Sequence, residues 1–217
     1  IVLITLLCLF VPFMTVHAAG EILFSDNFSD GNLDGWVIES GNWFINNGNL
    51  AGSKSGKNFG GRISSTEAGW ENYILETDFN VSQGIDAGIG FRHLKDVSGY
   101  ELNIRVGTGI FDTPQIILRK NQDGIVSIIG NTHSFPLINN KWYHLKTEVN
   151  GENIKVWVDN TSIFDIKDTN TKVKKGGITF SYWTGEVGVI FTRFDNIVVT
   201  KLTPVISKTP LIIIPGI

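Results

Sequence analysis

Six polar or aromatic side chains in the middle of the chain are of the types that bind sugars. If the apolar residues around them point into a core, they point outward, because side chains of a strand alternate between two faces. Arginine and carboxylate groups bind pairs of hydroxyl groups, and a tryptophan ring stacks on the apolar face of a sugar. The six residues are Arg92, Glu101, Asn103, Arg105, Arg119 and Trp183. They predict a carbohydrate-binding face; the alternative is a solvated sheet face whose charges pair with one another.

The same alternation assigns the core partners of these residues. Gly88 and Gly90 lie close to Arg92 in the sequence. Because a glycine within a strand lets another group approach the backbone, we expect room for a ligand there. The side chains expected to point into the core are Phe91, Tyr100, Leu102, Ile104, Leu118, Phe180 and Tyr182.

Strands, and no convincing helical period, recur between positions 21 and 200. Apolar and polar residues alternate clearly in segments 73–81, 100–106, 142–149 and 154–158. Turn signals separate such segments: Asn150-Gly151, Asp123-Gly124, and the Asn-Asn-Gly-Asn run at 46–49. An Asn-Gly pair between two alternating runs is the strongest short-range signal of a hairpin. About twelve short antiparallel strands are expected, which predicts an all-β fold of two stacked sheets.

Three stretches resemble a known superfamily. They are Lys-Trp-Tyr-His-Leu-Lys at 141–146 with its hairpin partner at 154–159, Phe-Ser-Asp-Asn-Phe at 24–28, and Phe-Asp-Asn-Ile-Val-Val at 194–199. Over residues 22–201 the chain resembles concanavalin A-like jelly rolls, especially laminin G-like domains. It is most similar to the bacterial lectin-like domains grouped with the 3-keto-disaccharide hydrolase type. The resemblance implies two antiparallel sheets, one of them concave, and frequent glycan binding, although this fold also carries enzymes and adhesion modules.

The same resemblance implies a structural calcium ion on the convex side. In many such jelly rolls the first and last strands lie close together, and a late-strand aspartate and backbone carbonyls hold the ion. Carried over to this sequence, Asp195 is the expected side-chain ligand, with Asp26 and Gly48 nearby. Calcium takes about six to eight oxygen ligands, which carbonyls and carboxylates supply. The alternative is that Asp195 and Asn196 form an ordinary turn at the end of a strand.

Catalysis within the sandwich has weaker sequence support. Glucanases of this fold carry three alternating acids on one strand, two of which act as nucleophile and general acid. The nearest pattern here is Glu76, Asp78 and Asn80, whose last position is an amide. We therefore expect Glu76 and Asp78 to be solvated outward residues and assign no catalytic residue.

Composition excludes several classes of function. The chain has 18 Lys and Arg against 21 Asp and Glu, so it lacks the excess of positive charge that binds nucleic acids. Its single cysteine, Cys8, excludes a disulfide framework. An apolar content of 42% excludes a disordered chain.

Both ends differ from the middle. Residues 1–18 are mostly apolar and end in Val-His-Ala, which is typical of a secretory signal peptide lacking its start; the alternative is a membrane anchor. We assign 19–201 to the sandwich and 202–210 to a linker. Residues 211–217, Leu-Ile-Ile-Ile-Pro-Gly-Ile, resemble the first core strand of an α/β-hydrolase of the lipase or esterase kind. The alternative there is an apolar tail or a membrane segment.

These observations predict a secreted bacterial carbohydrate-binding module of a larger protein. Its expected partner is a glycan or polysaccharide, and its expected role is to bring a hydrolase to that glycan. Two alternatives stay open. One is a glycoside-acting enzyme of the 3-keto-disaccharide hydrolase type, and the other is a structural or adhesion spacer without a ligand.

Overall fold

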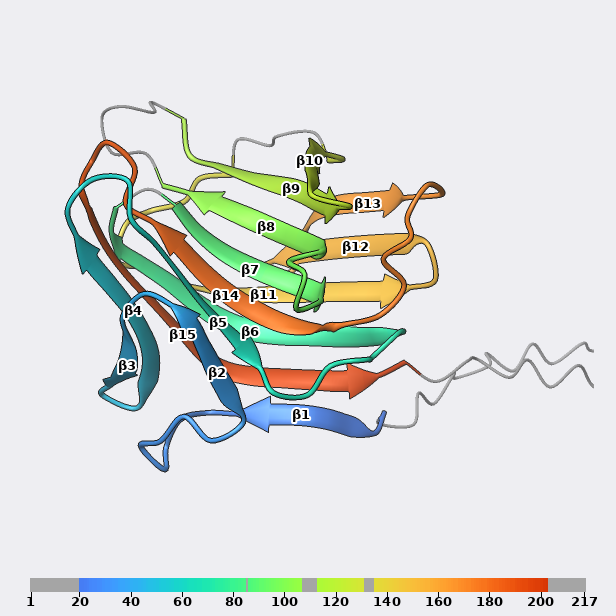
Figure 1. Cartoon of the computed structure of the whole chain (residues 1–217), viewed down its shortest axis with the longest axis horizontal. Helices are drawn as coiled ribbons and strands as arrows, with labels where there is room; N and C mark the ends of the chain where they lie inside the picture. Colours follow the sequence, from blue (N-terminus) through green and yellow to red (C-terminus); the bar gives the residue numbers. More distant parts are fainter. Residues whose placement is uncertain (1–19, 85, 107–112, 131–134, 203–217) are drawn as a thin grey trace, which may run out of the picture.

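This computed structural model describes residues 20–84, 86–106, 113–130 and 135–202. These residues form fifteen β-strands joined by turns and loops, and they contain no helix. The strands form two antiparallel sheets, A and B, one stacked on the other (Figure 1). The predicted all-β sandwich is confirmed. Because these residues hold no helix, they also hold none long and apolar enough to cross a membrane.

Sheet A has eight strands in the order β13–β12–β11–β6–β15–β4–β3, and β1 pairs with β15 beside this path. Their bounds are β1 Ile22–Asp26, β3 Trp43–Asn46, β4 Asn49–Ser55, β6 Tyr73–Gln83, β11 Trp142–Asn150, β12 Asn153–Val158, β13 Thr161–Lys167 and β15 Val189–Lys201. Sheet B has seven strands in the order β10–β9–β8–β7–β14–β5–β2. Their bounds are β2 Trp36–Ser40, β5 Gly60–Ser65, β7 Asp86–His93, β8 Gly99–Arg105, β9 Gln115–Gln122, β10 Ile125–Ile128 and β14 Gly177–Trp183.

The three predicted turns all connect paired strands. Asn150 pairs with Asn153, so the β11–β12 hairpin turns at Gly151 and Glu152. The turns at Asp123-Gly124 and Asn47-Gly48 place both central residues at positive φ, between 51° and 76°. This left-handed geometry matches the twist of the flanking strands and favours Asn, Asp and Gly, which explains why these turns could be predicted.

Aromatic rings from the two sheets meet in the core. Phe180 of β14 stacks on Phe194 of β15 with ring centroids 4.2 Å apart, and Tyr182 lies 5.2 Å from Trp43. The seven side chains predicted to point inward are all buried, so the predicted alternation is confirmed for them. Since each of their strands buries one face, the other face of sheet B is left for a site.

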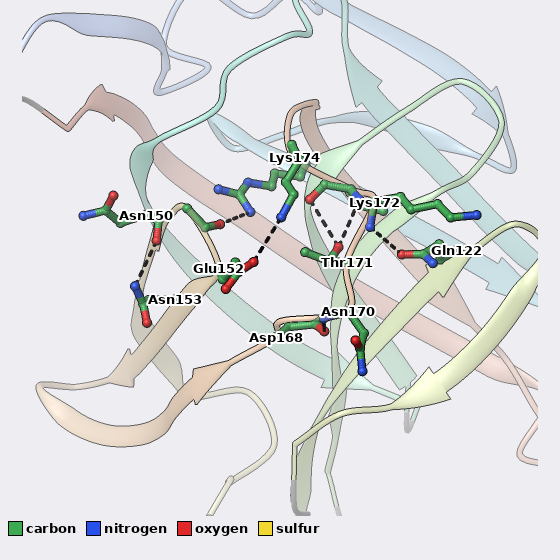
Figure 2. A network of polar contacts seen from close by, with 12 residues as sticks. Gln122, Asn150, Glu152, Asn153, Asp168, Asn170, Thr171, Lys172 and Lys174 are labelled. Atoms are coloured by element: carbon green, nitrogen blue, oxygen red, sulfur yellow. Dashed lines mark hydrogen bonds and ion pairs between the residues drawn. The ribbon is translucent and has the colours of Figure 1, made fainter.

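The segment after β13 crosses from sheet A to sheet B and is fixed by contacts to both (Figure 2). The Lys174 ammonium lies 3.6 Å from the Glu152 carboxylate of the β11–β12 turn, and the Lys172 backbone N–H donates to Gln122 of β9 at 2.8 Å. The buried Lys120 ammonium donates to Asp168 Oδ1 at 3.1 Å and lies 2.8 Å from Oδ2 of the same carboxylate. These contacts link sheet A to sheet B at one end of the sandwich.

The first and last strands lie side by side, as the resemblance implies. Ile22 of β1 pairs with Thr200 of β15, and an ion pair of 3.1 Å joins Glu21 to Lys201. The predicted signal peptide, the linker beyond Leu202, and the stretch 211–217 lie outside the described residues.

Candidate functional site

A cavity of about 540 Å³ opens on the outer face of sheet B, and five of the six predicted sugar-binding residues line it. Glu101, Asn103 and Arg105 alternate along β8, Arg119 comes from β9, and Trp183 ends β14. Its volume falls within the range of roughly 300–1,000 Å³ that ligand pockets occupy. The alternation that buries one face of these strands therefore gathers these five side chains around one cavity.

Strand register arranges the lining in cross-strand rows. Arg105 of β8 lies opposite Asp86 of β7, which in turn lies opposite Trp183 of β14. On β9 and β8, Arg119 lies opposite Glu101. Residues directly opposite each other in antiparallel strands have their Cβ atoms about 5 Å apart, so each row presents adjacent polar groups to one ligand.

Asp86 and Arg105 form the charged pair at one end of the cavity. The Arg105 Nε–H donates to Asp86 Oδ1 at 2.9 Å and to Asn103 Oδ1 at 3.0 Å. Burial raises the pKa of Asp86 above its ordinary value, while the charges of Arg105 and Arg119 partly oppose that rise. The pair is preorganised for bidentate contacts with vicinal hydroxyls, because its side chains are already fixed by each other.

Glu101 is fixed by a side chain from β14, two strands away in sheet B. The Ser181 hydroxyl of β14 donates to Glu101 Oε2 at 2.9 Å, and this bond spans β7 above Gly88. A Cβ on Gly88 would collide with Ser181 Oγ and lie 2.9 Å from the Glu101 carboxyl carbon. The expected ligand space at Gly88 is therefore filled by the protein's own side chains, so the glycine positions Glu101. A Cβ on Gly90 would likewise meet the Thr179 side chain.

Arg119 of β9 brings a second guanidinium to the cavity. Its guanidinium forms no side-chain hydrogen bond and no ion pair within 4.0 Å to any described residue, although its charge partly opposes the rise in the pKa of Asp86. Arg62 of β5 also lines the cavity, and its guanidinium lies 4.0 Å from Glu39. The Arg119 guanidinium can therefore donate to a ligand without breaking an internal bond.

Trp183 supplies the flat apolar surface of the cavity. Its side chain is 43% exposed, and its ring packs over Gly60 of the neighbouring strand, where a Cβ would come within 3.1 Å of it. An exposed indole beside fixed hydrogen-bonding groups fits a ligand with one apolar face and a rim of hydroxyls, as a sugar ring has.

The prediction that Arg92 shares this face is wrong. Arg92 is 1% exposed, and its guanidinium donates to the backbone carbonyls of Glu71 and Gly151 at 2.7–3.0 Å. The β7–β14 pairing shifts here, because Ile178 pairs with Phe91 and Gly177 pairs with His93. Arg92 is thus the extra residue of a β-bulge, with a φ of 48°, and its side chain leaves the alternating pattern.

Sequence reasoning missed two lining residues, Asp86 and Arg62. Both follow the same period as the residues that were found. Asp86 lies two residues before Gly88 and alternates with the buried Ala87, and Arg62 precedes the buried Ile63. Extending the alternation of β7 to its first residue identifies Asp86, and applying the same alternation to β5 identifies Arg62.

The predicted calcium residues lie where β1, β4 and β15 meet. Asp26 accepts from the Phe28 backbone N–H at 2.7 Å and from the Trp36 indole at 2.8 Å. Asp195 accepts from Asn49 at 2.8 Å and from the Asn196 backbone, and Gly48 lies in the adjacent turn.

Burial first, and then the charges of Asp78 and Asp26, raise the pKa of Asp195. No group of three or more His, Cys, Asp or Glu side chains in the described ranges is arranged to hold a metal. The protein's own donors thus occupy both predicted carboxylates, while the repulsion at Asp195 would be relieved by a cation. The calcium ion stays a prediction.

Glu76 and Asp78 share the outer face of sheet A, on the opposite side of the molecule from the cavity. Asp78 pairs with His144 at 2.7 Å and accepts from Asn196, and Glu76 lies 3.6 Å from the same imidazole. Both acids are part-exposed and paired. This placement agrees with the expectation that they are surface residues.

Comparisons with known proteins agree with this architecture. A family model described as the 3-keto-alpha-glucoside-1,2-lyase-like domain matches residues 23–200. The levanase of Bacillus subtilis strain 168 is 27% identical over 165 residues, which are 73% of this chain and 22% of the levanase. The chain thus spans about a fifth of that relative's length.

Solved structures with the same fold include two from Bacillus subtilis. The carbohydrate-binding module CBM66 superposes with a TM-score of 0.64 at 24% identity, covering 78% of this chain and 98% of the module. A protein of unknown function with a galectin-like fold gives a TM-score of 0.67 at 16% identity, covering 85% of this chain and 97% of that protein. The chain therefore has a carbohydrate-binding-module-like jelly-roll fold.

Proposed function

The chain belongs to the family of 3-keto-alpha-glucoside-1,2-lyase-like domains, and we propose that it is a carbohydrate-binding module whose ligand occupies the outer cavity of sheet B. The observation that carries this proposal is the half-exposed Trp183 ring beside the fixed Asp86–Arg105 pair in one cavity of ligand size. The ring stacks on the sugar's C–H face while the charged pair, Glu101 and Arg119 bind its hydroxyls.

The ligand class proposed first is a fructan. The support is the relationship to a levanase, an enzyme named for levan, which is a polymer of fructose. The cavity chemistry is compatible, because a fructose unit carries several hydroxyls within reach of closely spaced polar groups. Neutral sugars also suit a lining in which carboxylates and guanidinium groups occur together.

A polysaccharide panel with two matched variants tests the proposal. Levan, inulin, a β-glucan and a starch are run in affinity electrophoresis with the wild-type chain, Trp183→Ala and Trp142→Ala. Trp142 is 38% exposed but lies on sheet A, so its loss removes a comparable exposed ring away from the cavity. We expect retardation by levan, lost in Trp183→Ala and kept in Trp142→Ala. Equal retardation of all three proteins, or none by any polysaccharide, would refute the proposed site.

A second candidate function is catalysis on a sugar in the same cavity. It is favoured by the family description and by the two carboxylates, Asp86 and Glu101, that line the cavity. In this case Asp86→Asn would abolish product formation while leaving much of the binding. Incubating the chain with the polysaccharide that it retains, and with 3-keto-glucosides, and measuring released sugar separates the two candidates.

Export and hydrolase targeting are further parts of the proposal. The apolar run at 1–16, which continues into His17 and Ala18, supports export, and the resemblance of 211–217 to a hydrolase strand supports a C-terminal catalytic domain. Detection of the protein in culture medium, cleaved after Ala18, tests the first. Sequencing the gene beyond the codon for Ile217 tests the second, and a Gly-x-Ser-x-Gly motif is the expected finding.

A further inference from the structure

A second, smaller pocket of about 120 Å³ adjoins the outer cavity on the same face of sheet B. The two share three lining residues, Arg62, Glu101 and Arg119, which therefore form the border between them. Beyond this border the pocket reaches His93 at the end of β7 and Asn121 near the end of β9. A ligand in the first cavity can thus continue into the second without leaving the sheet.

The second pocket gathers polar atoms that have no partner within the protein. In the part of the chain that the structure describes, six buried side-chain atoms lack a hydrogen-bond partner. Three of them, Arg62 Nε, His93 Nε2 and Asn121 Oδ1, belong to residues that line this one pocket. Because an unpaired buried polar atom costs free energy, such a concentration indicates groups that a ligand or water is meant to satisfy.

His93 contributes an imidazole ring to this pocket. Burial first, and then the charge of Arg62, lower the pKa of its ring, against the opposing charges of Glu39 and Asp96. Glu39 Oε1 lies 3.5 Å from His93 Nε2, and it already accepts a hydrogen bond from the Ser64 hydroxyl. A neutral imidazole has one donor and one acceptor nitrogen, which suits hydroxyl groups rather than an anion.

Two exposed valines form the apolar walls of the pocket. Val97, in the β7–β8 turn, is 39% exposed, and Val126 of the edge strand β10 is 62% exposed. Val97 adopts a φ of 62°, a left-handed conformation that a β-branched residue rarely takes. Strained residues of this kind concentrate at functional sites. The pocket therefore combines apolar walls with polar atoms that have no partner within the described residues.

We propose that this pocket is a second saccharide subsite, which holds the unit linked to the sugar in the outer cavity. The module then recognises at least two consecutive units of a neutral polysaccharide rather than a single sugar. The proposal rests on the proposed function of the outer cavity and specifies how long its ligand must be.

The test compares affinities for fructose, levanbiose and levantriose, which are one, two and three units of levan, by isothermal titration calorimetry. The wild-type chain is expected to bind levanbiose about tenfold more tightly than fructose, because two units use both subsites. Asn121→Ala and Val126→Ala should lower the affinity for levanbiose about three- to tenfold and leave that for fructose nearly unchanged.

The matched control is Ile125→Ala. Ile125 is 70% exposed on the same strand as Val126 but points to the opposite side, so its loss should change neither affinity. Equal wild-type affinity for all three sugars, or an unchanged levanbiose affinity in Asn121→Ala and Val126→Ala, would overturn the second subsite while leaving the proposed function intact. If the wild-type chain binds none of the sugars, the proposed fructan function fails and the subsite fails with it.

Discussion

Two arginines on neighbouring strands have different tasks, although the sequence gives them the same apparent phase. Arg105 follows the alternation of β8 and turns outward to pair with Asp86 in the cavity. Arg92 sits at a bulge, is buried, and binds the carbonyls of Glu71 and Gly151. A residue type therefore indicates a role only when its phase relative to the core is known, and one extra residue in a strand reverses that phase.

Replacing Arg92 by alanine should affect stability and not binding. The change removes bonds to two backbone carbonyls and leaves those carbonyls without their charged donor, so we expect the free energy of unfolding to fall by about 2–4 kcal/mol. Urea denaturation measures the loss, and levan affinity of the folded variant should match that of the wild-type chain. If the variant has normal stability but no longer binds levan, Arg92 is part of the binding site and the structural role assigned to it is wrong.

Levan binding should weaken at acidic pH because of Asp86. Its raised pKa means that the folded carboxyl protonates at a higher pH than an ordinary aspartate, and the protonated form loses the ion pair with Arg105. Affinity is therefore expected to be full near pH 7 and to fall as the pH drops through this raised pKa. For stability, pH acts in the opposite direction. Because the pKa of Asp86 is raised in the folded chain, its contribution to the free energy of unfolding is largest at low pH and is lost as the pH rises through that pKa.

Asp86→Asn is the control for this pH dependence. The levan affinity of this variant should be weaker than that of the wild-type chain at pH 7. Between pH 7 and pH 4 it should change much less with pH than the wild-type affinity does. A variant that keeps the full wild-type pH profile would show that the titrating group lies elsewhere, for example at His93, whose pKa is lowered.

At the scale of the elements, the period of two residues accounts for what could be predicted. It identified the buried faces of β8, β9 and β14, and hence the outward side chains Glu101, Arg119 and Trp183. Asn-Gly and Asp-Gly turns revealed the hairpins, because their left-handed geometry restricts which residues fit. The bulge at Arg92 has no such signal, since neither glycine nor asparagine marks it. The cross-strand rows that line the cavity depend on which strands are neighbours in the sheet. That order is set by long-range pairing, which the local alternation of residues does not reveal.

Gly88 offers a test of how the strands position the site. In Gly88→Ala the new methyl group would collide with Ser181 and separate it from Glu101. We expect the free energy of unfolding to fall by about 1–3 kcal/mol and levan affinity to drop, as measured by urea denaturation and calorimetry.

Ser181→Ala is the companion variant for Gly88→Ala. It removes the bond to Glu101 without adding an atom, so it should weaken binding with little loss of stability. If Gly88→Ala binds levan as the wild-type chain does, Glu101 does not need its support and its assigned role is wrong.

At the scale of the whole molecule, sheet B carries the cavity, and sheet A contains the pairing of the first and last strands. The outer face of sheet B carries both pockets, whereas β1 and β15 pair at sheet A near Asp26 and Asp195. The two regions lie on different sheets and have no lining residue in common. Ligand binding and any stabilising ion at the paired strands should therefore act independently.

Calcium is expected to raise the thermal unfolding midpoint if the ion predicted from the resemblance binds. An ion that binds only the folded chain and relieves the repulsion at Asp195 should raise the midpoint by about 5 °C in millimolar calcium relative to excess chelator. Differential scanning calorimetry measures the shift, and Asp195→Asn should abolish it. If the wild-type midpoint is the same with calcium and with chelator, the chain binds no stabilising calcium ion and the prediction is wrong.

The most direct test of the central claim follows the indole N–H signals of the six tryptophans by NMR while levan oligosaccharides are added. We expect the Trp183 signal to shift and saturate, because its ring borders the outer cavity of sheet B. Trp142 and Trp157 lie on sheet A and should keep their positions. A shift confined to Trp142 or Trp157, with Trp183 unmoved, would place the ligand on the other sheet and contradict the account.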